Sequence, residues 1–139
     1  MNGRVAVLFL VLLTVPFAGI SQQAREPVRV SVFFGGGSYW IDEGQRDRIR
    51  FVVDSLQHIE RYEISIHSHT DDIGGAEYNK WLSQRRSGAA MDVLKEMAIP
   101  EHQITLKDFG QFNPIYSNDS WLGRRMNRRV DILFWPIVL

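Results

Sequence analysis

The order of hydrophobic periodicities along the chain is the feature that most constrains its fold. Alternation of apolar and polar residues, as in Val28 to Val32, is typical of a half-buried strand, whereas apolar residues three and four apart indicate an amphipathic helix. The predicted order is strand, helix, strand, helix, strand, short helix and strand, over residues 28–32, 42–59, 62–69, 78–97, 104–110, a few residues after Asp119 or Ser120, and 129–134. This order predicts an α/β two-layer sandwich with both long helices on one face of the sheet.

Composition limits both the domain count and the classes of partner. The chain has 139 residues, which is room for one domain, and we place that domain at residues 28–134 between a linker at 22–27 and a tail at 135–139. Sixteen basic residues balance sixteen acidic ones, so no long-range field attracts nucleic acid. The chain contains no cysteine, which excludes disulfides, thiolate metal sites and a lipidated cysteine.

The first 21 residues have the pattern of an export signal. Arg4 precedes an apolar run over 5–15, Pro16 ends the run, and the small residues Gly19 and Ser21 follow. This pattern predicts cleavage before Gln22, a periplasmic location and no membrane span in the mature chain. The alternative is an uncleaved anchor, but the apolar run is shorter than the ~20 residues that cross a bilayer.

One arginine falls within the apolar stripe of the second long helix. Arg86 lies four residues after Leu82 and four before Ala90, and Asn79 lies on the same face about two turns earlier. A buried guanidinium needs a partner, and Asp71, at the end of the preceding strand, is the best-placed carboxylate. Such a pair either docks the helix on the sheet or binds a ligand, and spacing alone does not decide between the two.

A second group of arginines precedes and begins the last strand. Four arginines occur within six residues, namely Arg124, Arg125, Arg128 and Arg129. They could form a solvated basic face, but strand alternation turns at least one of them inward or along the sheet edge. Arg128 is therefore a candidate second contact for an anion.

A long series of motifs is shared, in order, with one known family. In this sequence it comprises His69-Thr70-Asp71, Gly74, Tyr78-Asn79, Leu82-Ser83, Arg85-Arg86, Gly110, Pro114, Asn118, Gly123-Arg124 and Asn127-Arg128-Arg129-Val130. In these residues the stretch from Val28 to Phe134 resembles the OmpA-like C-terminal domain family. The resemblance implies a βαβαβ-type sandwich with a mixed sheet. It also implies a periplasmic module, associated with the outer membrane of a Gram-negative envelope, which binds peptidoglycan without cleaving it.

The resemblance also implies a ligand and the residues that bind it. The ligand is diaminopimelate in the peptidoglycan stem peptide, with its carboxylate on Arg86, its ammonium on Asp71, and further contacts from Thr70, Asn79 and Arg128. The chemistry agrees, because an arginine and an aspartate together match a carboxylate and an ammonium on one carbon. The family carries no cofactor, and an envelope protein is a candidate second partner. The glycine-rich loop Gly35–Gly37 departs from the family, so its role stays open.

Four other interpretations have less support. Gly35–Gly37 lacks the Lys-Ser/Thr of a phosphate loop, and His67 with His69 near two acids is more often an ordinary polar pair than a metal site. Ser83 has no nucleophile elbow or oxyanion loop, so we expect no catalytic residues and no enzyme. An inner-membrane stator or secretion-system anchor with an uncleaved helix is the main alternative function, although the apolar run carries no acid.

Overall fold

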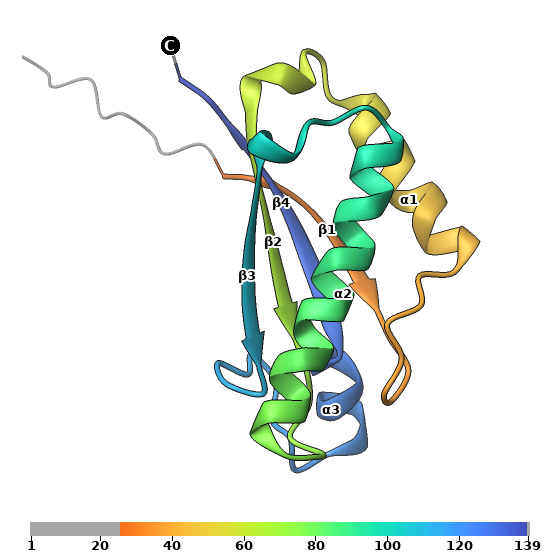
Figure 1. Cartoon of the computed structure of the whole chain (residues 1–139), viewed down its shortest axis with the longest axis vertical. Helices are drawn as coiled ribbons and strands as arrows, with labels where there is room; N and C mark the ends of the chain where they lie inside the picture. Colours follow the sequence, from red (N-terminus) through yellow and green to blue (C-terminus); the bar gives the residue numbers. More distant parts are fainter. Residues whose placement is uncertain (1–25, 139) are drawn as a thin grey trace, which may run out of the picture.

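The computed structural model describes residues 26–138, which form one mixed sheet with helices packed against it (Figure 1). The expected signal at 1–21 and the first part of the expected linker lie outside the described residues. The elements, in chain order, are β1 (Val28–Phe33), α1 (Glu43–Ser55), η1 (Ile59–Arg61), β2 (Tyr62–His69), α2 (Ala76–Glu96), η2 (Glu101–Gln103), β3 (Ile104–Gly110), α3 (Trp121–Asn127) and β4 (Arg129–Pro136). None of the helices described is long and apolar enough to cross a membrane.

The sheet has the order β1-β4-β2-β3, so the last strand of the chain lies inside it. β4 pairs antiparallel with β1 and with β2, whereas β3 pairs parallel with β2. A parallel pair needs a crossover connection, and α2 supplies it between β2 and β3. The predicted α/β sandwich with a mixed sheet is confirmed.

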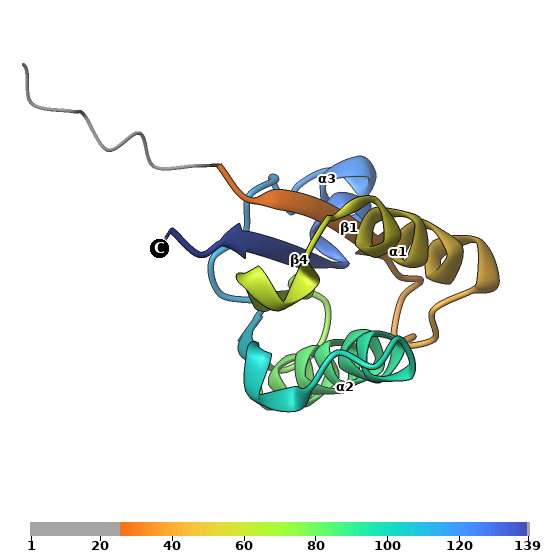
Figure 2. The same ribbon diagram turned by 90° about the horizontal axis from the view of Figure 1, so that it is seen from above.

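Both long helices cover the same face of the sheet (Figure 2). Alternate strand residues point to that face, and Ile132 of β4 lies directly between Val30 of β1 and Ile66 of β2. These three side chains join Ile49 of α1 and Val93 of α2 in one buried cluster. The core therefore fixes the position of α2 relative to the end of β2, where the predicted site lies.

The first long helix is shorter than the prediction of 42–59. Asp42 is its N-cap, with a carboxylate oxygen that accepts from the Gln45 amide at 3.0 Å, and the helix ends at Ser55. The chain then turns through His58, whose φ of 58° is left-handed, into a 3-10 turn. Ile59 still packs against the core from that turn. Its apolar character therefore predicted the core contact correctly, but the backbone there is a 3-10 turn and not the predicted α-helix.

The bounds of α2 and β4 also differ from the prediction by a few residues. The second long helix begins at Ala76 and ends at Glu96, where 78–97 was predicted, and Ser120 is the cap of α3, with its hydroxyl accepting from Gly123 at 3.0 Å. The last strand runs on through Pro136, where it was predicted to stop at Phe134, so Trp135 and Pro136 belong to the sheet and not to a tail.

Candidate binding site

The predicted site residues meet at one end of the sheet, where β1 and β2 end and α2 and β4 begin (Figure 1). A cavity of about 260 Å³ opens there. Its lining combines charged, amide and apolar side chains with glycine backbone, from Gly36, Gly37, Asp71, Ile73, Gly74, Tyr78, Asn79, Leu82, Arg86 and Arg128. Four of the five predicted residues line this cavity.

Arg86 is fully buried, as predicted, but its direct partners are backbone carbonyls. Its Nε donates to the Ser38 oxygen at 2.8 Å, its Nη1 to the His69 oxygen at 3.0 Å and its Nη2 to the Gly35 oxygen at 3.1 Å. The expected direct pairing with Asp71 is therefore wrong. The strand end and the glycine loop both aim carbonyls at the guanidinium, and carbonyl direction cannot be inferred from side-chain spacing.

The environment of Arg86 still includes the negative charge of Asp71. Burial lowers the pKa of the Arg86 guanidinium to about 10, and nearby Asp71 opposes that shift. Arg86 consequently stays protonated at neutral pH. A guanidinium has five N–H donors, and the carbonyls engage three of those on Arg86, which leaves two that these carbonyls do not engage.

Asp71 forms its ion pair with Arg128. The Arg128 Nη1 lies 3.0 Å from one carboxylate oxygen of Asp71, and the other carboxylate oxygen accepts from the Ile73 amide at 3.2 Å. Arg128 also donates from Nε to the Phe34 carbonyl at 3.1 Å, so it joins the ends of β1 and β2. The idea of a solvated basic face is wrong for Arg128 and for buried Arg129, whose Nε lies 3.0 Å from Asp131.

Asn79 brings an acceptor to the cavity. Its side-chain amide donates to the Asp71 carbonyl at 3.3 Å and to Gln111 at 2.8 Å, whereas its Oδ1 is buried and has no partner among the described residues. A buried acceptor without a hydrogen bond costs free energy unless a ligand or water supplies a donor. Thr70 is the predicted residue that does not line the cavity, and its hydroxyl donates to the Asp71 carbonyl at 2.9 Å.

The cavity thus presents donors and acceptors close together. Arg86 and Arg128 supply positively charged N–H groups, while Asp71 and Asn79 Oδ1 supply acceptors. With two guanidinium groups and one carboxylate, these side chains sum to one positive charge. Such an arrangement suits a ligand that carries a carboxylate and an ammonium and has an overall negative charge.

Sequence reasoning missed the loop residues of the cavity. Gly37 and Gly74 line it with φ values of 67° and 100°, a region that favours glycine. A side chain at either position would approach Tyr78, at 3.3 Å from its hydroxyl for Gly37 and 3.1 Å from its ring for Gly74. The glycine run was visible in the sequence, but only the fold shows that it borders the site.

The histidines and Ser83, weighed above for metal binding and hydrolysis, have other neighbours. His69 stacks on Phe109 with ring centroids 5.0 Å apart, and burial lowers the pKa of His69 to about 4. The Ser83 hydroxyl donates to the Lys80 carbonyl at 2.8 Å and does not line the cavity. Within residues 26–138, no group of three histidines and acids is placed to hold a metal ion.

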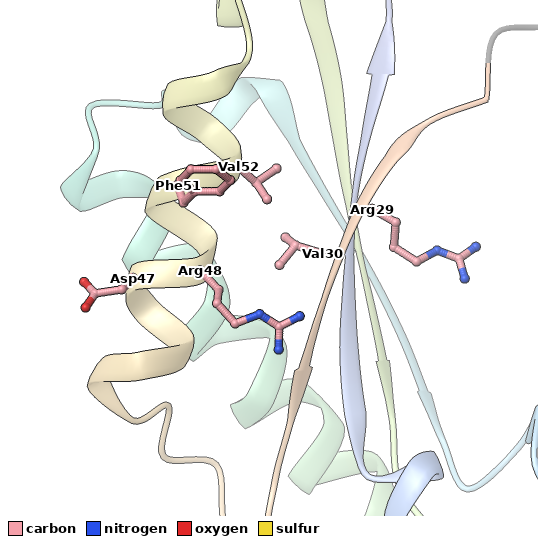
Figure 3. Close-up of a pocket in the computed structure, with 6 residues that line it drawn as sticks. All are labelled: Arg29, Val30, Asp47, Arg48, Phe51 and Val52. Atoms are coloured by element: carbon pink, nitrogen blue, oxygen red, sulfur yellow. The ribbon is translucent and has the colours of Figure 1, made fainter.

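A second hollow, of about 310 Å³, lies between α1 and β1 (Figure 3). Val30, Phe51 and Val52 form its apolar part. Figure 3 shows Arg48 reaching toward β1 but Arg29 pointing away from the helix. Its charged groups therefore do not converge, in contrast to those of the first cavity.

Comparison with known proteins gives one matching family model and several relatives. The model of the OmpA family matches residues 33–128, which is more than half of the chain. The chain is 28% identical to the outer-membrane lipoprotein YfiB of Pseudomonas aeruginosa over 73% of its own length and 61% of the lipoprotein. It is 30% identical to the peptidoglycan-associated lipoprotein of Brucella melitensis over 80% of its own length and 66% of that protein.

A solved structure is similar in fold. The crystal structure of the peptidoglycan-associated lipoprotein from Burkholderia pseudomallei superposes with a TM-score of 0.69 at 25% identity, over 75% of this chain and 88% of that one. The two curated lipoproteins are longer than the region they share with this chain, which spans less than two thirds of each.

Proposed function

Because this chain belongs to the OmpA family, we propose that it binds peptidoglycan without cleaving it and so attaches an envelope component to the cell wall. Two of the similar proteins are named peptidoglycan-associated lipoproteins. The observation that carries the proposal is the cavity in which Arg86, Arg128, Asp71 and Asn79 converge. Because the chain spans only part of its curated relatives, the envelope component itself stays outside the proposal.

The proposed ligand is the free α-carbon end of diaminopimelate in a stem peptide. Its carboxylate would contact the unused N–H groups of Arg86 and Arg128, and its ammonium would donate to Asp71 and to the free Oδ1 of Asn79. The stem peptide also carries the carboxylate of its glutamate, and the net positive charge of the cavity favours such an anion. A lysine in place of diaminopimelate keeps the ammonium and lacks the adjacent carboxylate, so it should bind more weakly.

Binding without cleavage agrees with the chemistry of the cavity. Its charged groups are engaged in hydrogen bonds that hold them in place, and among the described residues its lining includes no serine, threonine, cysteine or histidine. A hydrolytic role would need a nucleophile or an activated water near the ligand, and the one carboxylate of the lining, Asp71, is engaged by Arg128 and the Ile73 amide. We therefore assign these residues to recognition.

We also propose that residues 1–21 direct export to the periplasm and are removed, and that the binding domain runs from residue 28 to residue 136, the end of β4. The supporting pattern is Arg4, the apolar run and the small residues before Gln22. Intact-mass measurement of the protein from the cell envelope should give a chain that begins at Gln22. A mass that includes Met1 would indicate an uncleaved anchor.

Co-sedimentation with purified sacculi tests the binding proposal. Asp71→Asn keeps the side-chain shape and removes the negative charge, so it should weaken binding to diaminopimelate-type sacculi more than tenfold, since removing one member of a desolvated charge pair costs about 2 to 5 kcal/mol. Asp72→Asn is the matched control. Asp72 is the neighbouring residue, is exposed, and pairs with Arg124 outside the cavity at 3.4 Å.

The two variants separate recognition from nonspecific attraction. The wild type and Asp72→Asn should pellet with the sacculi, and Asp71→Asn should stay in solution. Equal pelleting of all three folded proteins would contradict the proposed role of Asp71. Failure of the wild type to pellet would contradict peptidoglycan binding itself.

A further inference from the structure

Exposed aromatic side chains lie near the cavity, on α2 and on the loop that follows β1. We name Tyr39, Trp40, Tyr78 and Trp81 the aromatic platform; between 41% and 75% of the surface of each residue is exposed. Exposed aromatic rings that gather at one place mark a contact surface more often than rings scattered singly. None of the residues proposed above to bind the zwitterion belongs to the platform.

Three rings of the platform contact one another, and one of them reaches the cavity. Tyr78 lines the cavity, its ring centroid lies 5.7 Å from that of Trp81, and Trp81 lies 6.1 Å from Tyr39 in an edge-to-face arrangement. The guanidinium of Arg85 lies 5.5 Å from the centre of the Trp81 ring. Tyr78, Trp81 and Tyr39 therefore form a continuous surface that starts at the cavity wall and carries one cation.

The loop part of the platform is anchored to the binding arginine. Arg86 donates to the Ser38 carbonyl, and the Ser38 hydroxyl accepts from the Trp40 amide at 3.1 Å. Tyr39 lies between these two anchoring residues in the chain. The platform and the cavity are thus held in one arrangement, so that a single extended ligand could contact both.

We propose that the aromatic platform binds a sugar ring of the glycan strand whose stem peptide enters the cavity. Stacking suits this ligand, because the C–H face of a pyranose is apolar with partly positive hydrogens and the face of an aromatic ring is negative. Arg85 can donate to the hydroxyl and acetamido oxygens at the rim of the sugar. This inference rests on the proposed function and adds a second subsite to it.

The spacing of peptidoglycan supports one ligand across both subsites. An alanine and a glutamate separate diaminopimelate from the lactyl group of muramic acid, and an extended residue spans at most about 3.6 Å. The three methylene groups between the two α-carbons of diaminopimelate and the lactyl group add to this length, so the sugar lies roughly 10 to 15 Å from the zwitterion. The Trp81 ring centroid lies 5.7 Å from that of Tyr78 in the cavity wall, so a ligand of this length can extend from the cavity over Trp81.

The test compares two soluble ligands that share a peptide. One is the tripeptide alanyl-glutamyl-diaminopimelate, and the other is the same tripeptide on its N-acetylglucosamine–N-acetylmuramic acid disaccharide. Calorimetric titration of the mature chain should show tighter binding of the disaccharide form. Trp81→Ala should weaken binding of that form by about two- to tenfold, the range for loss of one aromatic contact, and leave tripeptide binding unchanged.

Trp121→Ala is the matched control, because Trp121 is also exposed and has Arg125 5.4 Å from its ring centre, but it is outside the platform and the cavity lining. It should bind both ligands as the wild type does. Equal affinity of the wild type for the two ligands, or an equal loss for both in Trp81→Ala, would overturn the sugar subsite and leave the zwitterion site intact.

Two further outcomes would overturn the sugar subsite by different routes. If the wild type binds neither ligand, the proposed function fails and the sugar subsite fails with it. If Trp81→Ala instead abolishes binding to vesicles of phosphatidylethanolamine and phosphatidylglycerol, with no effect of the disaccharide, the platform is a membrane contact and the inference is wrong.

Discussion

Replacement of Arg86 by lysine should destabilise the fold even without ligand. Arg86→Lys keeps the positive charge, but one ammonium cannot reach the carbonyls of Gly35, Ser38 and His69 at once, because these lie around a planar fork. About two charged hydrogen bonds are lost, each contributing roughly 1.5 to 3 kcal/mol. We expect the free energy of unfolding to fall by about 3 kcal/mol, a large part of the roughly 5 to 15 kcal/mol typical of a domain.

Urea denaturation of the chain over residues 22–139 measures this loss. With a slope of about 1 to 3 kcal/mol per molar urea, the midpoint should fall by at least about 1 M. Arg85→Lys is the control, since Arg85 is the adjacent residue on α2 and is exposed. Its free energy of unfolding should match that of the wild type within about 0.5 kcal/mol.

A midpoint for Arg86→Lys that equals the wild-type value would refute the reasoning. It would mean that the three carbonyls find other hydrogen-bond donors at no cost in free energy. Arg86 would then contribute to ligand binding and not to the stability of the fold. The same result would make Arg86→Ala a clean test of binding, whereas the structure indicates that this variant loses stability and affinity together.

Substitutions at three further positions, His69, Gly123 and Ser120, should change the stability of the fold. Burial, reinforced by the nearby charge of Arg129, lowers the pKa of His69 from 6.5 to about 4, so the unfolded chain takes up the proton first as pH falls. The stability associated with neutral His69 is present above pH 6.5 and should fall by up to about 3 kcal/mol by pH 4, and His69→Gln should flatten the denaturation midpoint over that range. In Gly123→Ala the new methyl group would lie 1.8 Å from the Ser117 carbonyl oxygen, and we expect at least about 3 kcal/mol of destabilisation in a thermal melt, against little change for Gly36→Ala, which has open space around it. Ser120→Ala removes the hydroxyl that caps α3 at 3.0 Å and should cost about 1 kcal/mol in urea denaturation, whereas a loss below about 0.3 kcal/mol would show that the cap is not needed.

The sequence alone was enough to predict the layers and the position of Arg86. Alternation in β1 and β2 and the apolar stripe of α2 are strong signals, because burial of one face requires them. Arg86 was recognisable because a charged residue in an apolar stripe needs hydrogen-bond or ion-pair partners once it is buried. The structure places it fully buried beside the cavity, on the predicted face of the helix.

The hydrogen-bond partners could not be predicted in the same way. Arg86 binds carbonyls of the glycine loop and of the β2 end, and those groups depend on backbone direction at turns, which residue types constrain only weakly. Arg128 was expected as a second anion contact, and its ion pair with Asp71 depends on how β4 is inserted between β1 and β2. Periodicity predicts the faces of strands but not their order in the sheet.

Calorimetric titration with two soluble stem peptides tests the central claim most directly. The peptides are alanyl-glutamyl-diaminopimelate and alanyl-glutamyl-lysine, which differ in the carboxylate next to the terminal ammonium. Because Arg86 and Arg128 line the cavity, the diaminopimelate peptide should bind at least about tenfold more tightly, and Asp71→Asn should remove most of its affinity. Equal binding of the two peptides to the wild type would contradict recognition of an amino-acid zwitterion in this cavity.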